Sequence, residues 1–344
     1  MARELFGTDG IRGRALEWPL DEETIRRLGV ALVRLMANGD PKPSFLIGGD
    51  TRASTETLAD WLSVGIQAAG GTVTWGGILP TPAVSHLLRV GSCTAGVVIS
   101  ASHNPAEDNG VKVLAATGEK ISESSEELLE DELKRAPAKV GPGLPAIRPG
   151  LIDRYRTRVL QALENPRPLE GLHLVLDAAN GAASGLADEI LETMGAKVTA
   201  IASAPDGMNI NRGVGAASPQ QLSEAVLRLG ADGGLALDGD ADRAVLVDEK
   251  GTILDGDDLL LSWAASLHGE GRLPDNKIVA TVMSNFGLET GLAAEGIDLI
   301  RCSVGDRAVW ETMARTGAAL GGEQSGHIIC SHLSVTGDGL LTGT

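Results

Sequence analysis

The stretch "SFLIGGDTRASTETLADWLSVGIQAA", residues 44–69, holds a short apolar run, a polar turn and a longer segment with helical spacing. Phe45 to Ile47 show no alternation of apolar and polar side chains, which is typical of a strand covered on both faces in a mostly parallel sheet. The turn "GGDTRAS" leads into a helix predicted over Thr55 to Ala69. This order of strand, turn and helix indicates an α/β fold.

Two later stretches repeat the same order. Leu172 to Leu176 precede "DAANGAAS" and a helix predicted to run through Met194, and Ile278 to Val282 precede "MSNFG" and a helix predicted to run through Ala294. The copies lie roughly 100 to 130 residues apart, which is the size of one domain. The sequence therefore predicts an α/β protein of tandem similar α/β/α domains with mixed, mostly parallel sheets.

Two segments without such patterns mark the predicted domain boundaries. "APAKVGPGLPAIRPG", Ala136 to Gly150, is rich in proline and glycine, and "DEKGTILDGDD", Asp248 to Asp258, contains a turn. We therefore expect a first domain over residues 1–150, a second over 151–254 and a third over 255–344.

Composition limits the partners and the compartment. The 29 Lys and Arg residues face 46 Asp and Glu residues, and the formal net charge of −17 argues against nucleic acid or an acidic membrane surface as a partner. Cys93, Cys302 and Cys330 form no CxxC pair, which suits a reducing compartment and predicts neither a disulfide framework nor a zinc site. Apolar runs of about 5 residues are far shorter than the roughly 20 of a membrane-spanning helix. We expect a cytoplasmic protein without a membrane partner.

A serine-containing loop follows the predicted buried strand Gly96 to Ile99. It reads Ser100-Ala101-Ser102-His103-Asn104-Pro105, and open α/β sheets bind their ligands at the carboxyl ends of the strands. Neighbouring side chains such as Ser102 and His103 seldom point the same way, and the chain has no GxSxG motif, so a Ser/His/Asp hydrolase is not predicted. The loop is either a ligand site or an ordinary turn in which Ser and Asn bond the backbone.

Three aspartates alternate in "LDGDADR" after the apolar run Leu235 to Leu237: Asp238, Asp240 and Asp242. Carboxylates this crowded repel one another unless a cation or solvent relieves them, and Mg²⁺ prefers oxygen ligands. The sequence predicts a magnesium site here. A solvated acidic turn is the alternative, because Gly239 and Asp240 also fit a hairpin.

An EF-hand explains the same loop less well. Glu249 stands at position 12 of such a motif, but Arg243 replaces the glycine required at position 6. A strand is predicted over Ala244 to Val247, where an EF-hand needs a helix. Arg243 could instead modulate the acidic cluster or bind a phosphate oxygen.

A third loop and two cations complete the candidate site. In "GGEQSGHIIC", Glu323, Ser325 and His327 alternate; on an extended turn they would point the same way and could bind a polyol, although a structural turn explains the pattern equally well. Arg12 in "FGTDGIRG" and Lys112 could bind phosphate or could be solvated surface charges. No GxxxxGK[ST] or complete dinucleotide motif predicts a nucleotide site.

Five motifs, in this order, resemble those of the α-D-phosphohexomutase superfamily: "FGTDGIRG", "ISASHNPAEDNGVK", "LDGDADR", "VGDR" and "GGEQSGH". The first and last are most similar to the bacterial branch that acts on glucosamine phosphates. The resemblance implies that Ser102 is a phosphoserine. It also implies one Mg²⁺ per chain, bound by Asp238, Asp240 and Asp242 together with the phosphate on Ser102.

The resemblance implies roles for further residues. It places sugar or substrate contacts on Glu323, Ser325, Asp306, Arg307 and Arg243. It implies that proton and phosphoryl transfer are assisted by Arg12, His103, Lys112 and His327.

The reaction implied by the resemblance interconverts glucosamine 6-phosphate and glucosamine 1-phosphate through a sugar 1,6-bisphosphate, and supplies precursors of UDP-N-acetylglucosamine and the cell wall. A small-molecule hexosamine phosphate is the expected partner, and the chain is expected to be a monomer or homodimer. The superfamily has a fourth, phosphate-binding domain with an "SGTEP"-type loop; we expect it to be absent here and the third domain to be incomplete. Phosphomannomutase or phosphoglucomutase activity, or an inactive sugar-phosphate-binding fragment, are the alternatives.

Overall fold

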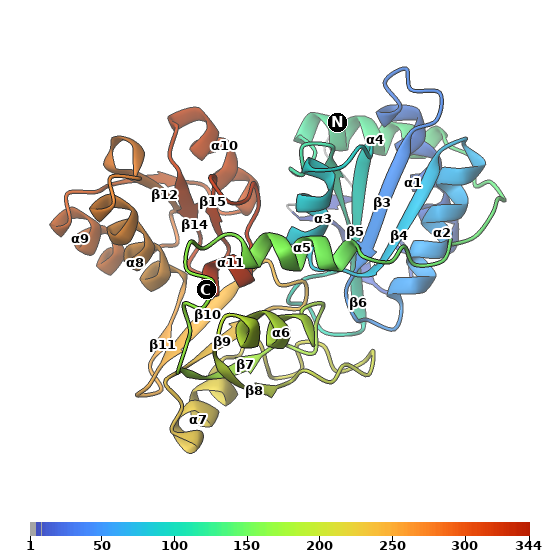
Figure 1. Cartoon of the computed structure of the whole chain (residues 1–344). Helices are drawn as coiled ribbons and strands as arrows, with labels where there is room; N and C mark the ends of the chain where they lie inside the picture. The colour runs from blue at the N-terminus through green and yellow to red at the C-terminus, as the bar shows by residue number, and fades with distance from the viewer. Residues whose placement is uncertain (1–4, 8) are drawn as a thin grey trace. The chain divides into compact units, whose positions relative to one another are not determined.

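The computed structural model describes residues 5–7 and 9–344, and three mixed β-sheets follow one another along this part of the chain (Figure 1). The chain divides into two compact units. One ends at Tyr155 and includes Pro205–Ile210, and the other comprises Arg156–Ala204 and Asn211–Thr344. The first unit holds one sheet and the second holds two, and each unit is described by itself.

The sheet of the first unit has the strand order β1-β2-β6-β5-β3-β4. Its strands are β1 (Phe6–Gly7), β2 (Gly10–Arg14), β3 (Ser44–Gly49), β4 (Thr72–Ile78), β5 (Ala95–Ile99) and β6 (Asp108–Ala115). The helices of this region are α1 (Glu22–Met36), α2 (Thr55–Ala68), α3 (Thr81–Arg89) and α4 (Glu123–Arg135), and α5 (Leu151–Leu160) follows them. Strands β5, β3 and β4 are parallel, and β6 is antiparallel to β5.

The central strand β3 is covered on both faces. Phe45 and Ile47 pack into one core with buried residues of α1, α2 and α4. Gly48, which points to the other face, lies against Val84 of α3, so closely that an added Cβ would be 2.8 Å from it. Because both faces are buried, the strand needs no polar side, and the prediction drawn from its apolar run is confirmed.

The second unit holds two further sheets, with strand orders β11-β10-β9-β7-β8 and β13-β12-β14-β15. The strands of the first are β7 (His173–Asp177), β8 (Lys197–Ile201), β9 (Gly233–Leu237), β10 (Ala244–Asp248) and β11 (Ile253–Leu254), with helices α6 (Leu186–Thr193) and α7 (Gln220–Leu229). The strands of the second are β12 (Lys277–Thr281), β13 (Asp298–Cys302), β14 (Leu320–Gly322) and β15 (Ile328–Cys330). Its helices are α8 (Gly256–Gly269), the 3₁₀ turn η1 (Pro274–Asn276), α9 (Phe286–Ala294) and α10 (Asp306–Thr316), followed by α11 (Gly339–Gly343).

The three sheets share one topology. In each, a central strand (β3, β7 or β12) has a parallel neighbour on either side, and one of these neighbours (β5, β9 or β14) continues through a loop into an antiparallel strand (β6, β10 or β15). The three predicted strand–turn–helix units are all present, as β3 with α2, β7 with α6, and β12 with α9. The prediction of tandem, similar α/β/α domains is confirmed.

Helix starts follow from side chains that accept backbone N–H groups. Asp21 accepts the N–H of Thr24 at the start of α1, Asn285 accepts that of Leu288 at the start of α9, and Asp255 opens α8 in a capping box. Among the described helices, none combines the length and the apolar character needed to cross a membrane.

Candidate active site

The predicted motifs lie in equivalent loops of the three sheets. The loop that joins a parallel strand to the following antiparallel strand holds Ser102 between β5 and β6, the three aspartates between β9 and β10, and the "GEQSGH" motif between β14 and β15. All three loops therefore lie at the carboxyl end of a parallel strand, which is where α/β sheets bind ligands.

Ser102 is buried, with 1% of its surface exposed, in a tightly bonded loop. Its backbone has φ = 52°, in the left-handed region, and its N–H donates to Ser100 Oγ over 2.9 Å. This conformation brings Ser102 Oγ to 3.3 Å from His103 Nδ1. The expectation that these two neighbouring side chains diverge was wrong, because their polar atoms lie within hydrogen-bond reach across this left-handed residue.

Arg52 and Asp50, in the turn after β3, are buried next to the serine loop. Arg52 Nε donates to Asp50 Oδ2 over 2.9 Å, and the same carboxylate accepts from Ser100 Oγ over 2.6 Å. In the sequence, "GGDTRAS" indicates only a turn, and neither residue was predicted to belong to the site. They could have been found from the strand pattern, because the turn after β3 and the loop after β5 follow adjacent parallel strands.

Three cations surround the carboxylate of Asp9. Arg12, Lys112 and Lys120 each form an ion pair with Asp9, with a Lys112 Nζ to Asp9 Oδ2 distance of 3.2 Å. Arg12 Nη1 also donates to the side-chain oxygen of Asn104 in the serine loop, at 3.4 Å. Lys112 is only 1% exposed, so the alternative of a solvated surface charge is wrong for it. The cluster adjoins the serine loop and adds Lys120, which no sequence motif indicated.

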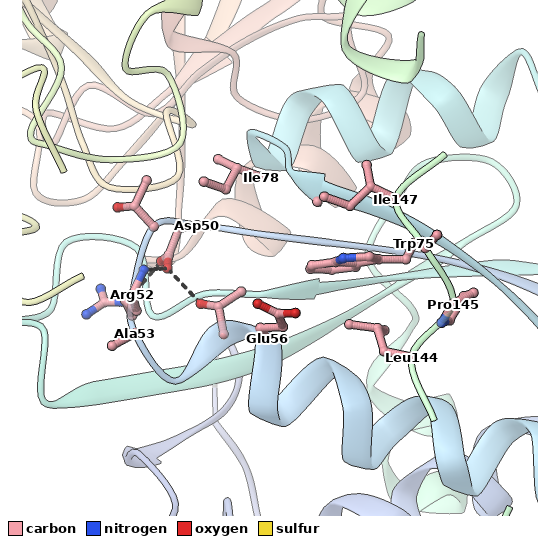
Figure 2. A pocket seen from close by; sticks show the side chains of 13 residues that line it. Asp50, Arg52, Ala53, Glu56, Trp75, Ile78, Leu144, Pro145 and Ile147 are labelled. Atoms are coloured by element: carbon pink, nitrogen blue, oxygen red, sulfur yellow. Dashed lines mark hydrogen bonds and ion pairs between the residues drawn. The ribbon is translucent and has the colours of Figure 1, made fainter. Parts of the chain in front are cut away.

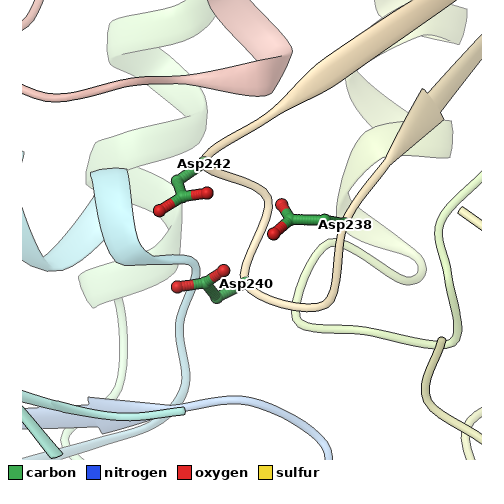
Figure 3. Close-up of side chains that lie close together, drawn as sticks. All are labelled: Asp238, Asp240 and Asp242. Atoms are coloured by element: carbon green, nitrogen blue, oxygen red, sulfur yellow. The ribbon is translucent and has the colours of Figure 1, made fainter. Parts of the chain in front are cut away.

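The three aspartates form a compact buried cluster (Figure 3). One carboxylate oxygen from each of Asp238, Asp240 and Asp242 lies within 4.8 Å of the others, and none of these residues is more than 4% exposed. The solvated-turn alternative is therefore wrong, although the loop does close a hairpin between β9 and β10. The EF-hand alternative also fails, because β10 is a strand. Three buried carboxylates that converge in this way fit a hard cation.

Arg243 lies beside this cluster. Its backbone N–H donates to Asp238 Oδ1 over 3.2 Å, and its Nε lies 3.8 Å from Asp242 Oδ1. Burial alone would lower the pKa of Arg243, but the carboxylates of Asp242, Asp238 and Glu323 outweigh it and raise the pKa. Arg243 therefore remains charged between the acidic loop and the "GEQSGH" loop.

His327 is buried against the same aspartates. Its Nε2 accepts the backbone N–H of Gly337 over 3.0 Å, and its Nδ1 lies 3.6 Å from Asp242 Oδ2. Burial tends to lower the pKa of His327, but Asp242, Asp306 and Glu323 raise it above the usual value. A histidine in this position can exchange a proton with its surroundings and hold a positive charge next to the acidic cluster.

The other residues of the third loop do not share one direction. Residues 323–326 form a tight turn, in which the N–H of Gly326 donates to the carbonyl oxygen of Glu323 over 3.0 Å. As a result Ser325 is exposed while His327 is buried, and the expectation that Glu323, Ser325 and His327 point the same way was wrong.

The "VGDR" segment lies beside this turn. Glu323 Oε1 accepts the N–H of Gly305 over 3.1 Å, which places Asp306 and Arg307, at the start of α10, next to the third loop. Asp306 Oδ1 accepts the N–H of Arg307 over 2.7 Å. Within the second unit, the structure therefore gathers Asp238, Asp240, Asp242, Arg243, Asp306, Arg307, Glu323 and His327 into one region.

The loop "DAANGAAS" after β7 supports the aspartate loop from the adjacent strand. Buried Asp177 accepts the N–H of Ala179 over 2.9 Å and that of Gly215 over 2.7 Å; burial raises the pKa of Asp177 to about 6 in spite of these bonds. The N–H of Ala182 donates to the carbonyl oxygen of Gly239, which lies between Asp238 and Asp240.

Replacing Gly181 with alanine should distort the aspartate loop. A Cβ on Gly181 would lie 2.4 Å from the carbonyl oxygen and 2.7 Å from the Cα of Gly239, and backbone atoms cannot move away as a flexible side chain can. We expect Gly181→Ala to weaken divalent-cation binding about tenfold, as calorimetry would measure. Gly269→Ala is the matched control, because a Cβ there meets no atom within 4 Å. Equal divalent-cation affinities for the two variants would show that contact with Gly181 does not support the aspartate loop.

Ser102, His103, Arg12 and Lys112 lie in the first unit, and the aspartates and the third loop lie in the second. The predicted contact between a phosphate on Ser102 and a metal at the aspartates therefore stays a prediction.

Models of three families match consecutive parts of the chain. They are described as phosphoglucomutase/phosphomannomutase α/β/α domains I, II and III, and they match residues 3–139, 153–251 and 255–344, respectively. The phosphoglucosamine mutase of Solibacter usitatus is 44% identical over 345 residues, which span 99% of this chain and 77% of that protein.

The fold of the chain also resembles those of solved structures. A phosphoglucomutase/phosphomannomutase family protein from Burkholderia thailandensis has a TM-score of 0.85 at 26% identity, over 98% of this chain and 75% of that one. The N-acetylphosphoglucosamine mutase of Aspergillus fumigatus, solved with GlcNAc-6P and magnesium, has a TM-score of 0.55 at 16% identity, over 99% and 76%, and shows a similar fold.

Proposed function

We propose that this chain, which belongs to the phosphoglucosamine mutase family, interconverts glucosamine 6-phosphate and glucosamine 1-phosphate. The observation that carries the proposal is the identity of 44% over 99% of the chain to a phosphoglucosamine mutase. The geometry supports it, because the serine, the buried aspartates and the third loop occupy equivalent positions in three repeated sheets.

In the proposed reaction Ser102 carries the phosphoryl group. Starting from glucosamine 1-phosphate, the bond between Ser102 Oγ and phosphorus breaks, a bond forms between phosphorus and the sugar 6-oxygen, and the 6-hydroxyl proton passes to a base. The 1,6-bisphosphate then reorients. The bond between phosphorus and the 1-oxygen breaks, the group returns to Ser102 Oγ, and glucosamine 6-phosphate is released with a proton on its 1-oxygen. Phosphoryl transfer of this kind depends mainly on positioning and on charge stabilisation.

Asp238, Asp240 and Asp242 would hold one Mg²⁺, with the phosphate on Ser102 as a further ligand. When bound, Mg²⁺ supplies a Lewis acid that withdraws electron density from the transferring group. The fit rests on three converging buried carboxylates. Arg243, charged and in contact with Asp242, would limit the negative charge of the loop and could bind a phosphate oxygen of the substrate.

The cations of the first sheet would bind phosphoryl oxygens. Arg12 and Lys112 already share a carboxylate, that of Asp9, so their side chains are held in place before an anionic substrate arrives. His103, whose Nδ1 lies 3.3 Å from Ser102 Oγ, would hydrogen-bond the serine or its phosphate. This separation is within reach of a weak hydrogen bond, which supports that role for His103.

The third loop and its neighbours would bind the sugar. Glu323 and Ser325 would hydrogen-bond its hydroxyl or amino groups, and Asp306 and Arg307 would border the same site. His327, whose pKa is raised by Asp242, Asp306 and Glu323 against the effect of burial, would serve in proton transfer.

A comparison of substrates tests the sugar preference. The chain should convert glucosamine 1-phosphate at least about tenfold more efficiently, by kcat/KM, than mannose 1-phosphate or glucose 1-phosphate, since a site built to bond an amino group loses a partner when it is absent. Coupled assays with each sugar phosphate measure this. A preference for mannose or glucose phosphate would contradict the proposed substrate and favour phosphomannomutase or phosphoglucomutase activity.

A further inference from the structure

We propose that Arg52 is a positioning residue for phosphoryl transfer at Ser102, because its guanidinium group holds the backbone of the serine loop. The inference rests on the proposed role of Ser102 as the phosphoryl carrier. Arg52 lies in the turn after β3, about fifty positions before the loop that it contacts. It belongs to none of the five motifs that resemble those of the superfamily.

The guanidinium group lies at the centre of the serine loop. It donates hydrogen bonds to backbone carbonyl oxygens of Ser102 (3.0 Å), Asn104 (2.9 Å), Asp108 (3.1 Å) and Pro105. Its remaining donor, Nε, bonds Asp50 Oδ2 over 2.9 Å. Arginine has five N–H groups in a planar fork, and these bonds use both terminal nitrogens and Nε. One side chain therefore links four carbonyl groups of the loop between residue 102 and residue 108.

Arg52 is itself held rigidly. The side chains of Arg52 and Asp50 are both fully buried as an ion pair, and Asp50 also accepts the backbone N–H of Arg52 and the hydroxyl of Thr55. Asp50 Oδ2 accepts from Ser100 Oγ, which in turn accepts the N–H of Ser102. A closed path of hydrogen bonds thus runs from Arg52 through Asp50 and Ser100 to Ser102, and returns to Arg52 through the Ser102 carbonyl group.

This closed path explains how Ser102 keeps its conformation. A residue with a Cβ atom disfavours the left-handed region that Ser102 occupies, at φ = 52°. Its N–H and its carbonyl oxygen are both bonded to the Arg52 network, so the surrounding groups hold the backbone in that region. This backbone conformation sets the direction of the Cα–Cβ bond of Ser102, and with it the point from which Oγ would present the transferred group.

Lysine cannot reproduce the contacts of Arg52. It keeps the positive charge and the pairing with Asp50, but it has a single nitrogen with three donors and cannot reach four carbonyl oxygens in the geometry of a fork. Arg52→Lys therefore tests positioning with the charge retained. Arg34→Lys is the matched control. Arg34 of α1 also forms an ion pair, with Nη1 2.7 Å from Oε1 of Glu132 in α4, but this pair lies outside the serine loop.

The test measures phosphate on Ser102 after incubation with glucosamine 1,6-bisphosphate and Mg²⁺, by intact mass and peptide mapping over time. We expect Arg52→Lys to phosphorylate about 100-fold more slowly than the unmodified chain, because a small misplacement of a reacting atom has an effect of this size. The dissociation constants for Mg²⁺ and glucosamine 6-phosphate should stay within about twofold. Arg34→Lys should match the unmodified chain in all three measurements.

A second measurement reports directly on the flexibility of the serine loop. In hydrogen–deuterium exchange, the peptide spanning residues 100–108 should exchange faster in Arg52→Lys, while the other peptides of the first sheet keep their protection. This reading does not depend on activity. If the unmodified chain takes up no phosphate, the proposed function is wrong. If the peptide of residues 100–108 exchanges at the same rate in Arg52→Lys as in the unmodified chain, the positioning role alone is wrong.

A cavity next to Arg52 allows a third test (Figure 2). It has a volume of about 530 Å³ and is lined in part by Asp50, Arg52 and Trp75, with the exposed side chains of Ile78 and Ile147 at its edge. Shortening Arg52 to alanine would vacate the space of a guanidinium group among the carbonyl oxygens of the serine loop. We expect added methylguanidinium to restore phosphorylation of Arg52→Ala about tenfold or more, and ammonium at the same ionic strength to restore none.

Two outcomes would overturn the inference. One is Arg52→Lys phosphorylating at the rate of the unmodified chain. The other is a loss of rate in Arg52→Lys that equals its fraction of unfolded protein, measured by circular dichroism, with uniform exchange across the first sheet. A role limited to fold stability predicts that second outcome.

Discussion

Ser102→Ala should take up no phosphate from glucosamine 1,6-bisphosphate, and its mutase activity should fall by about 10³-fold or more. The substitution removes the single oxygen that would carry the phosphoryl group. Alanine fits the buried position and keeps the N–H that bonds Ser100 and the carbonyl group that bonds Arg52. The loss should therefore come from the chemistry, with little change in stability.

The measurement is phosphopeptide mapping of the segment around residues 96–114, together with a coupled assay of turnover. Ser63→Ala is the matched control, because Ser63 is fully buried in α2 of the same unit and lies outside the serine loop. The control should keep its phosphate on Ser102 and its activity. Phosphate on another residue of Ser102→Ala, with turnover near that of the unmodified chain, would rule out Ser102 as the carrier.

Asp240→Asn should bind Mg²⁺ more weakly and phosphorylate Ser102 more slowly. In the absence of metal, the variant should be more stable than the unmodified chain. Asp240 contributes one of three buried carboxylates whose oxygens lie within 4.8 Å of one another. Asparagine keeps the shape of the side chain but removes a negative charge, so Mg²⁺ affinity should fall about 100-fold and phosphorylation of Ser102 should fall with it. Without a cation, the removed charge also removes repulsion, and the free energy of unfolding should rise by about 1 to 2 kcal/mol.

Titration calorimetry with Mg²⁺ and thermal unfolding in a chelator measure the two effects. Asp298→Asn is the control in the same unit, since Asp298 is exposed at the amino end of β13. The control should change neither quantity. A lower melting temperature for metal-free Asp240→Asn would show that the three carboxylates do not repel one another in the folded protein, and unchanged Mg²⁺ affinity would remove this loop as the metal site.

The strand pattern was enough to predict the fold and to place the three loops. Runs such as Phe45 to Ile47 have no polar side because helices cover both faces of β3. The loops could be predicted because the end of each buried run is visible in the sequence, and crowded aspartates there indicate a cation. These features depend on residues close together in the chain.

The features that the sequence did not reveal depend on contacts between distant residues or on local turn geometry. Arg52 acts on carbonyl oxygens, which have no signature in the sequence of the loop that they belong to. The alternation of Glu323, Ser325 and His327 suggested an extended segment, but a turn closed by Gly326 separates their directions. Likewise, the left-handed backbone of Ser102 depends on bonds to groups outside its own motif.

The equivalence of the three hairpin loops has a consequence for how such a protein can evolve. A fold made by duplicating one ancestral unit starts with three copies of the same loop, each supported by its own sheet. Selection can then alter one copy without refolding the others, and one copy could acquire the serine, the next the aspartates and the last the "GEQSGH" turn. If the last loop binds the sugar as proposed, divergence confined to that copy would change the sugar preference and leave the proposed phosphoryl chemistry of the other two loops unchanged.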